Sequence, residues 1–387
     1  MVMCIDFDGE FLLPTGNVGD FAVIACDQFS SRSEYWRELE HTMPRGSALE
    51  LILPECFLSE TENRIKSIEA ASRAMIGGGR FKAYRGAVAV TRTTVYGRTR
   101  HGLVASINLD DYDYKQGSTA LIRASERTIE ERIPPRVRIR EAIDIELPHI
   151  LLLVDDRDNL LGSAIERSKK SKLYDAELKG NGGHISGSLI SAGDTAELYA
   201  AVDKLIKQSV KKFGSPLFAL VGDGNHSLAT AKYCRQHNPT PLNGNALVEI
   251  INIYDEGLVF EPIHRLVKTD DTQGFINELK SVMHGDDRTS VFSPEESEIN
   301  VPSDRVEAIN AVDAFCEKYV AEHGGYIEYV HGDAALKRPG YVGIALRGVG
   351  KSELFSYVVK DGVLPKKTFS LGEAEEKRFY LEARKIK

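Results

Sequence analysis

Runs of consecutive hydrophobic residues recur along the chain and are separated by short polar turns. Such runs predict buried strands, because a strand covered on both faces needs no polar positions. Segments in which β-formers alternate with glycine and arginine predict a strand meander. We expect the meander over 83–109 and strands over 21–26, 48–53, 147–154, 217–221, 246–254, 325–330 and 340–346.

Other segments carry hydrophobic residues three and four positions apart, the spacing that predicts an amphipathic helix. We expect helices over 34–42, 60–75, 121–140, 196–213, 227–236, 274–283 and 305–322, and a charged helical run after Gly372. The interleaving of helices and strands predicts an α/β fold of mixed α/β and α+β character.

The chain is long enough to need more than one hydrophobic core. It has 387 residues, of which 42% are hydrophobic and 27% are charged, the balance of an ordinary globular protein. No flexible linker is long enough to separate independent modules. We therefore expect three α/β lobes packed together, over 1–145, 146–269 and 270–387, the last with a returning tail.

Charge and cysteine usage restrict the partners and the environment. The net charge of -8 argues against non-specific binding to a phosphate backbone. The five cysteines are scattered and never form a CxxC pair, as is usual for reduced thiols in the cytoplasm. No apolar run is long enough for a membrane span, and the first residues are acidic, unlike a signal peptide. We expect a cytoplasmic protein that binds neither nucleic acid nor membrane.

The string Gly222-Asp223-Gly224-Asn225-His226-Ser227 lies between an expected strand and an expected helix. A tight glycine turn at a helix N-terminus lets backbone N–H groups face an anion such as a phosphate. Asp223 and His226 are the candidate catalytic groups within it. The same string also suits a plain turn in which Asn225 or Ser227 only caps the helix. Its spacing is neither that of a Walker A loop nor that of a dinucleotide-binding GxGxxG.

Two acids and one histidine are weaker candidates. Asp27 and Glu55 each follow an expected strand, where a carboxylate can take a proton from a hydroxyl, although most acids at such places are caps or turn residues. His184 lies in the glycine-dense string 180–187. That string suits either backbone that closely approaches a ligand or a flexible surface loop.

Basic residues that could neutralise phosphate charge occur in three places. Arg136, Arg138 and Arg140 follow two prolines and alternate as on one face of a strand. The other two places are His264-Arg265, after a proline, and Lys366-Lys367-Thr368, in the polar tail. Arginine suits phosphate because it binds in a bidentate manner, but a solvated strand face or charged tail explains each group equally well. No metal-binding motif is present, so no metal site of the protein's own is expected.

Over nearly its whole length, the chain resembles the bacterial proteins grouped as domain of unknown function 1015. The resemblance rests on long strings in the same order, including AVIACDQFSSRSEYW (22–36), LPHILLLVDD (147–156), GDGNHSLATAK (222–232), NIYDEGLVFEPIHRL (252–266) and LPKKTFSLGEAEEKRFYLEARKI (364–386).

The central string of that family, close to Asp-Gly-His-His-Arg, is similar to the phosphate-binding strand, loop and helix of the ParB/sulfiredoxin fold. That fold includes nucleotide-binding partition proteins and free-serine kinases. Asp223, Gly224 and His226 match the family string, whereas Asn225 replaces the first histidine and Ser227 replaces the arginine. The resemblance implies a ParB/sulfiredoxin-like core in the lobe 146–269, with ATP or ADP and Mg²⁺ as cofactors.

Taken together, the loop and the resemblance favour a nucleotide-dependent phosphotransferase acting on a small hydroxylated metabolite, with serine or phosphoserine as the first substrate to try. The loop would hold the phosphates, Asp223 or His226 would position the transferred group or Mg²⁺, and Asp27 or Glu55 would be the base. The alternative is a non-catalytic, nucleotide-binding switch or adaptor of the ParB type. A third interpretation is that the altered loop has lost its ligand.

Overall fold

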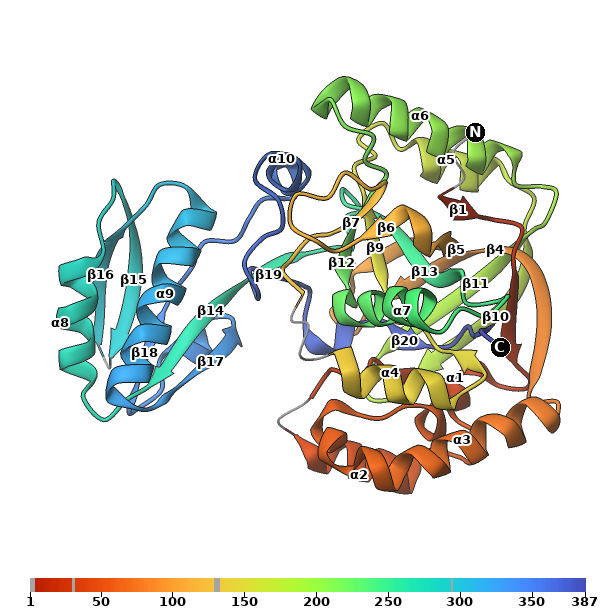
Figure 1. The fold of residues 1–387 in the computed structure, drawn as a ribbon, viewed down its shortest axis with the longest axis horizontal. Helices are drawn as coiled ribbons and strands as arrows, with labels where there is room; N and C mark the ends of the chain where they lie inside the picture. Colours follow the sequence, from red (N-terminus) through yellow and green to blue (C-terminus); the bar gives the residue numbers. More distant parts are fainter. Residues whose placement is uncertain (1–3, 30–31, 129–132, 294) are drawn as a thin grey trace. The chain divides into compact units, whose positions relative to one another are not determined.

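The computed structural model describes residues 4–29, 32–128, 133–293 and 295–387 (Figure 1). The chain forms two compact units. Unit 1 comprises Met1–Leu258, Val359–Gly362 and Ala374–Lys387, and unit 2 comprises Val259–Val358 and Val363–Glu373. The first of the three expected lobes and most of the second therefore lie in one unit, to which the chain returns for its last residues.

An 11-stranded mixed sheet forms the centre of unit 1. Its strands are β1 (Ile5–Asp6), β2 (Glu10–Pro14), β4 (Phe81–Thr93), β5 (Thr99–Asn108), β6 (Tyr112–Asp113), β7 (Ile122–Ala124), β9 (Leu151–Val154), β10 (Ser171–Leu178), β11 (Gly183–Ser191), β12 (Ala219–Asp223) and β13 (Asn245–Asn252). The order is β10-β11-β4-β5-β13-β9-β12-β7-β6, with β1 beside β5 and β2 beside β4. Strand β12 runs antiparallel to β9 and parallel to β7. The end of β12 therefore lies beside the beginning of β9.

Helices cover both faces of this sheet (Figure 1). They are α1 (Val18–Phe21), α2 (Ser33–Thr42), α3 (Thr61–Gly77), α4 (Ile133–Ala142), α5 (Leu160–Arg167), α6 (Ala196–Phe213) and α7 (Asn225–His237). Successive strand residues point to opposite faces, so Leu103 packs in the core with α5, α6 and α7, whereas Val104 packs in the core with α2 and α3. These two cores confirm the expected α/β class.

The charged run after Gly372 is not the helix that we expected. A 3-10 turn at Ala374–Glu376 is followed by β20 (Phe379–Tyr380), which pairs with β3 (Val23–Ile24), and β21 (Arg384–Lys385), which pairs with β8 (Ile145–Glu146). The prediction was wrong because the charged side chains of this run are buried among partners in the fold. Charged residues in this segment therefore do not indicate a solvent-exposed face.

Two more local predictions are wrong, one at a short apolar run and one at a pair of prolines. Residues 48–53 form a 3-10 helix over Ala48–Leu51 and then extended chain, since a short apolar run is compatible with any buried conformation. Residues 121–140 contain β7 and most of α4, and not one continuous helix. Pro134 lies in the first turn of α4, where its missing N–H costs nothing, so the prolines begin that helix rather than end one.

The glycine-dense string 180–187 belongs to the hairpin of β10 and β11, not to a loop around a ligand. A Cβ at Gly183 would lie 2.2 Å from the carbonyl oxygen of Thr93, and one at Gly187 would lie 2.2 Å from the ring of Tyr174. These glycines therefore make room for neighbours within the sheet.

Unit 2 contains an antiparallel sheet and the helices α8 (Thr272–Val282) and α9 (Arg305–His323). Its strands are β14 (Phe260–Lys268), β15 (Asp287–Ser293), β16 (Glu295–Val301), β17 (Tyr326–His331), β18 (Tyr341–Ile344) and β19 (Phe369–Leu371). Their order is β16-β15-β18-β14-β17, with β19 beside β14. The boundary between the units falls within α10 (Lys351–Asp361). Within the described parts of the chain, no helix has both the length and the apolar character needed to cross a membrane.

Candidate functional site

The loop between β12 and α7 makes a tight turn at Gly224. Gly224 precedes the helix with φ 81°, and its N–H is bonded to Oδ1 of Asp223 at 2.9 Å. The first hydrogen bond of α7 runs from the N–H of Leu228 to the carbonyl of Gly224 at 3.0 Å. The N–H groups of residues 225–227 lie ahead of that bond, at the positive end of the helix dipole.

A lysine from the C-terminal segment lies beside this loop. Nζ of Lys377 is 3.3 Å from Oδ2 of Asp223, and the two side chains are 10% and 18% exposed. The ammonium neutralises the carboxylate, which would otherwise repel an anion at the helix N-terminus. The loop therefore combines backbone donors with a compensated acid.

His149, just before β9, connects the loop to residues from distant parts of the chain. Its Nε2 is 3.4 Å from Oγ of Ser227 and 3.9 Å from Oδ2 of Asp27. Its Nδ1 is 2.8 Å from the hydroxyl of Tyr380, which donates to Sγ of Cys26 at 3.0 Å. The hydroxyl of Tyr380 thus connects His149 with Cys26, and Nε2 of His149 faces Ser227 and Asp27.

Cys26 and Tyr380 act in this network as neutral hydrogen-bonding groups. Burial, and after it the charge of Asp27, raises the pKa of Cys26 to about 12. Burial also raises the pKa of Tyr380 well above its ordinary value. Neither group ionises near pH 7, so neither is a candidate nucleophile or base.

A cavity of about 130 Å³ opens next to His149 and Ser227. Glu55 and Arg136 form an ion pair on its wall, and their side chains are 19% and 16% exposed. The backbone N–H of Glu55 is bonded to the carbonyl of Cys26 at 2.8 Å, which ties this wall to the His149 network. The structure thus brings three expected residues, Asp27, Glu55 and Arg136, close to His149 and the loop residue Ser227.

A family model described as "Protein of unknown function (DUF1015)" matches residues 11–348. The chain belongs to this family. No curated protein matches its sequence.

Solved structures show only a distant likeness to this DUF1015 protein. A conserved hypothetical protein from Pyrococcus furiosus is 13% identical, with 73% of this chain and 95% of that chain covered and a TM-score of 0.38. Free serine kinase in complex with AMP is 12% identical, with 73% and 91% covered and a TM-score of 0.40. SbnI with a C-terminal truncation, from Staphylococcus aureus, is 10% identical, with 72% and 85% covered and a TM-score of 0.40.

Two expected residues of unit 1 lie away from the loop. Arg138 is on the exposed side of α4, where it pairs with Glu62, because the three arginines follow a helix and not the strand face that we expected. His184 is on β11 and pairs with Asp175 at 2.6 Å. The four strands β4, β5, β13 and β9 separate β11 from β12, a distance of about 24 Å at the usual strand spacing.

His264 and Arg265 of this DUF1015 protein are buried in unit 2. Nε and Nη2 of Arg265 donate to the two carboxylate oxygens of Asp313 at 2.6 and 2.9 Å, and the side chain is 0% exposed. Nδ1 of His264 accepts the N–H of Leu346 at 3.0 Å. Both side chains therefore serve the interior of that unit.

The polar tail also belongs to unit 2. Lys366 pairs with Glu317 at 2.8 Å, and this hydrogen bond raises the pKa of the lysine. Lys367 has φ 57°, and its carbonyl accepts from Arg265 at 3.0 Å. The hydroxyl of Thr368 donates to the carbonyl of Pro365 at 2.8 Å, and the side chain is buried.

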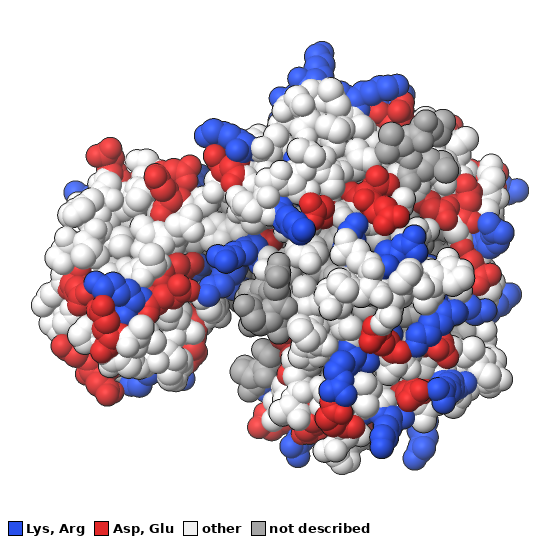
Figure 2. Space-filling model, in the orientation of Figure 1, with Lys and Arg blue, Asp and Glu red and all other residues white. Residues whose placement is uncertain are grey.

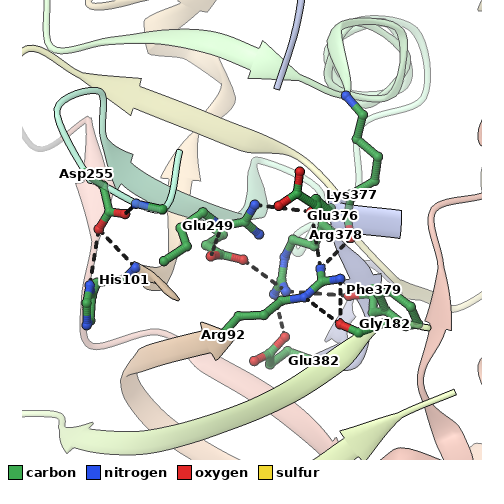
Figure 3. A network of polar contacts seen from close by, with 12 residues as sticks. Arg92, His101, Gly182, Glu249, Asp255, Glu376, Lys377, Arg378, Phe379 and Glu382 are labelled. Atoms are coloured by element: carbon green, nitrogen blue, oxygen red, sulfur yellow. Dashed lines mark hydrogen bonds and ion pairs between the residues drawn. The ribbon is translucent and has the colours of Figure 1, made fainter. Parts of the chain in front are cut away.

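The C-terminal segment that carries Lys377 and Tyr380 is held in unit 1 by buried charges (Figure 3). Arg378 pairs with Glu249 of β13 at 3.1 Å and with Glu382 at 2.5 Å. Arg92 of β4 donates to the carbonyls of Gly182 and Lys377. Burial, followed by the charge of a neighbouring arginine, lowers the pKa of Arg92 to about 9. The segment is thus part of the core of the unit.

Three residues of the site were missed from the sequence, namely His149, Lys377 and Tyr380. His149 stands at the start of an apolar run and looks like a buried histidine of the core. Lys377 and Tyr380 stand in the run that we expected to be a charged helix. The sequence did offer one signal, because all three residues lie within strings that this chain shares with the family.

On the face of the molecule shown in Figure 2, Lys and Arg side chains are interspersed with Asp and Glu. This mixed distribution agrees with the modest net charge of -8.

Proposed function

We propose that this DUF1015 protein binds a nucleotide at the loop before α7 and transfers its terminal phosphoryl group to a small hydroxylated metabolite. The observation that carries the proposal is the convergence at the N-terminus of α7. There, Lys377 compensates Asp223, and His149 faces both Ser227 and Asp27 beside a cavity. Serine and phosphoserine are the first substrates to test.

The loop supplies the groups that hold phosphates. Backbone N–H groups of the first turn of α7 and the helix dipole favour a negative charge at this point. Lys377 adds a cation that the sequence did not reveal, and His226 of the loop is half-buried in the first turn. In phosphoryl transfer such groups act by positioning the phosphates and stabilising charge, which is the largest part of the catalysis.

The proton of the acceptor hydroxyl goes to Nε2 of His149 or to the carboxylate of Asp27, which lie 3.9 Å apart. Glu55, the other expected base, is engaged by Arg136 and serves the wall of the cavity. As the proton leaves, the acceptor oxygen forms a bond to the terminal phosphorus. The bond from that phosphorus to the bridging oxygen breaks, and the nucleoside diphosphate leaves with the electron pair.

Magnesium fits this site only as a partner of the nucleotide. Among the described residues, no three His, Cys, Asp or Glu side chains are grouped as ligands for a metal ion. Mg²⁺ is commonly held by one or two carboxylates together with substrate phosphates, and Asp223 is the carboxylate at the loop. When bound, the ion would neutralise charge on the phosphates.

A thermal-shift screen tests the binding step. The protein is melted with Mg²⁺ and ATP, ADP, CTP or GTP, each with and without serine or phosphoserine. We expect one nucleotide to raise Tm, because a ligand that binds only the native state stabilises it. The shift should disappear in Asp223→Ala and His226→Ala but persist in Asp175→Ala, whose carboxylate lies on β10.

The outcomes separate the hypotheses. No shift with any nucleotide would contradict the proposal and favour a loop that has lost its ligand. A shift that needs Asp223 but leads to no transfer to any hydroxylated compound would favour the non-catalytic switch instead.

A further inference from the structure

The ring of His149 has partners at both of its nitrogens. Nδ1 is 2.8 Å from the hydroxyl of Tyr380, and Nε2 is 3.4 Å from Oγ of Ser227 and 3.9 Å from Oδ2 of Asp27. The rings of His149 and Tyr380 also meet edge to face, with centroids 5.3 Å apart and planes at 90°. The two residues are 4% and 2% exposed. The tyrosine therefore fixes the direction in which Nε2 points.

The pairing of two short strands brings Tyr380 to this place. Strand β20 runs antiparallel to β3, and Tyr380 is the register partner of Val23. Cys26 and Asp27 follow shortly after β3. Cys26 lies beside the hydroxyl of Tyr380, whereas Asp27 lies on the Nε2 side of the imidazole. One strand pair thus sets both sides of the ring.

The hydroxyl of Tyr380 has two side chains within reach of its single proton. It donates to Sγ of Cys26 at 3.0 Å and lies 2.8 Å from Nδ1 of His149, while its oxygen accepts the backbone N–H of Cys26 at 3.2 Å. Burial raises the pKa of Cys26 to about 12 and the pKa of Tyr380 well above its ordinary value, so both groups keep their protons near pH 7. Because a hydroxyl and a thiol each donate and accept, the hydroxyl can meet Nδ1 as donor or as acceptor.

This freedom lets the ring of His149 keep its partner whether or not Nδ1 carries a proton. If Nδ1 is protonated, it donates to the tyrosine oxygen, and the hydroxyl donates to Sγ of Cys26. If Nδ1 is unprotonated, the hydroxyl donates to it, and the thiol donates to the tyrosine oxygen. A buried polar atom without a partner is costly, so a contact that survives in both forms keeps the ring in place.

We propose that Tyr380 is the positioning residue of His149 in the phosphoryl transfer, with Cys26 as the partner of the tyrosine proton. As Nε2 of His149 takes the proton of the acceptor hydroxyl, Nδ1–H stays bonded to the oxygen of Tyr380, whose own proton stays on the side of Sγ. Nε2 therefore faces the acceptor before and after the proton moves. The inference rests on the proposed function, because it assigns the residues that position the base of that same transfer.

Tyr380→Phe tests the positioning role, because it removes the hydroxyl and keeps the ring. With the full chain, Mg²⁺, ATP and serine, kcat should fall about 10- to 100-fold, as for a misplaced base, while KM for ATP stays within about twofold. Tyr199→Phe is the matched control. The hydroxyl of Tyr199 accepts the N–H of Phe7 at 3.0 Å and lies 3.1 Å from Oδ2 of Asp8. Its loss should lower stability and leave kcat unchanged.

Cys26→Ala and Cys26→Ser test the partner of the tyrosine proton. Cys26→Ala leaves that proton to Nδ1, so the ring proton of His149 lies on Nε2, which then cannot take another from a hydroxyl. We expect kcat to fall about tenfold. Cys26→Ser again offers the hydroxyl an acceptor and should restore most of this loss. Equal kcat in the two variants would overturn the role of Cys26.

NMR of the ¹⁵N-labelled imidazoles detects the contact without any substrate. The chain has ten histidines, and His149→Gln identifies the signals of His149 by their loss. The Nδ1 signal should shift in Tyr380→Phe and stay in place in Tyr199→Phe. An unchanged Nδ1 signal in Tyr380→Phe would overturn the inference.

The two measurements separate failure of this inference from failure of the proposed function. Transfer by the parent protein with an unchanged kcat in Tyr380→Phe would overturn this inference alone. Absence of transfer by the parent protein, with the Nδ1 shift present in Tyr380→Phe, would instead contradict the proposed function.

Discussion

Gly224 has a backbone conformation that few other residues adopt, at the point where the loop becomes α7. Its φ is 81°, and a Cβ would lie 3.0 Å from both Cα and Cγ1 of Ile150. We expect Gly224→Ala to lower the free energy of unfolding by about 2–3 kcal/mol, from left-handed strain and the close contact together. Urea unfolding measures this loss of stability.

Gly214→Ala is the matched control for that variant. Gly214 ends α6 with φ 68°, and a Cβ there meets nothing within 4 Å. Gly214→Ala should lower the free energy of unfolding by about 1 kcal/mol, from the left-handed strain alone. Equal losses in the two variants would show that the contact with Ile150 does not constrain the loop.

Glu146 links folding to pH through the arginines around it. Its carboxylate accepts from Nε of Arg384 at 2.8 Å and from the N–H of Leu247 at 2.9 Å, and it pairs with Arg140. Burial alone would raise its pKa, but the charges of Arg384 and Arg140 outweigh burial and lower it. A lowered pKa contributes stability above the unfolded value, about 4.3, and that stability is lost as the pH falls through the folded pKa.

Urea unfolding at pH 7 and pH 3.5 tests this linkage. Glu146→Gln should be less stable at pH 7 by about 3 kcal/mol, because two buried arginines lose their partner. It should also lose less stability than the parent protein between the two pH values. Glu197→Gln, which removes an exposed pair with Arg167, should behave like the parent protein. If Glu146→Gln lost as much stability as the parent protein between pH 7 and pH 3.5, the link between Glu146 and the pH dependence of stability would be contradicted.

At the scale of elements, the sequence predicts the long periodic segments well. Helix α6 has the expected bounds, Ala196–Phe213, because its apolar stripe is regular and Gly214 ends it. Helix α7 lies within two residues of its expected bounds for the same reason. The predictions for residues 48–53 and for the run after Gly372 were wrong. These segments are buried by residues distant in the sequence, so their own hydrophobic positions show no regular period.

The C-terminal segment places Lys377 beside Asp223 of the loop, so its part in the proposed nucleotide binding can be measured. We expect Lys377→Met to weaken nucleotide binding about tenfold, because Asp223 then stands uncompensated beside the phosphates. Isothermal titration calorimetry measures the change. Lys385→Met, in the same segment but exposed, should bind as the parent protein does. Equal affinities in both variants would remove Lys377 from the site.

At the scale of the whole molecule, the sequence predicts where the candidate loop lies but not which residues contact it. Ser227 and His149 are 78 residues apart, and His149 and Tyr380 are 231 residues apart. They meet because β12 runs antiparallel beside β9 and because β20 pairs with β3. Strand order of this kind depends on packing across the whole sheet, so no local pattern reveals it. Asp27 and Glu55 were expected because strand ends are frequent places for ligands, but a 3-10 helix and extended chain, not a strand, precede Glu55.

The central claim is that the loop before α7 supports phosphoryl transfer to a hydroxylated acceptor, and ³¹P NMR tests it most directly. The full chain is incubated with Mg²⁺, ATP and serine or another small hydroxylated metabolite. We predict loss of the terminal phosphate signal of ATP and the appearance of a phosphomonoester, with a rate about 100-fold lower in Asp223→Ala. Unchanged ATP with every acceptor, or equal rates in Asp223→Ala and the parent protein, would contradict the account.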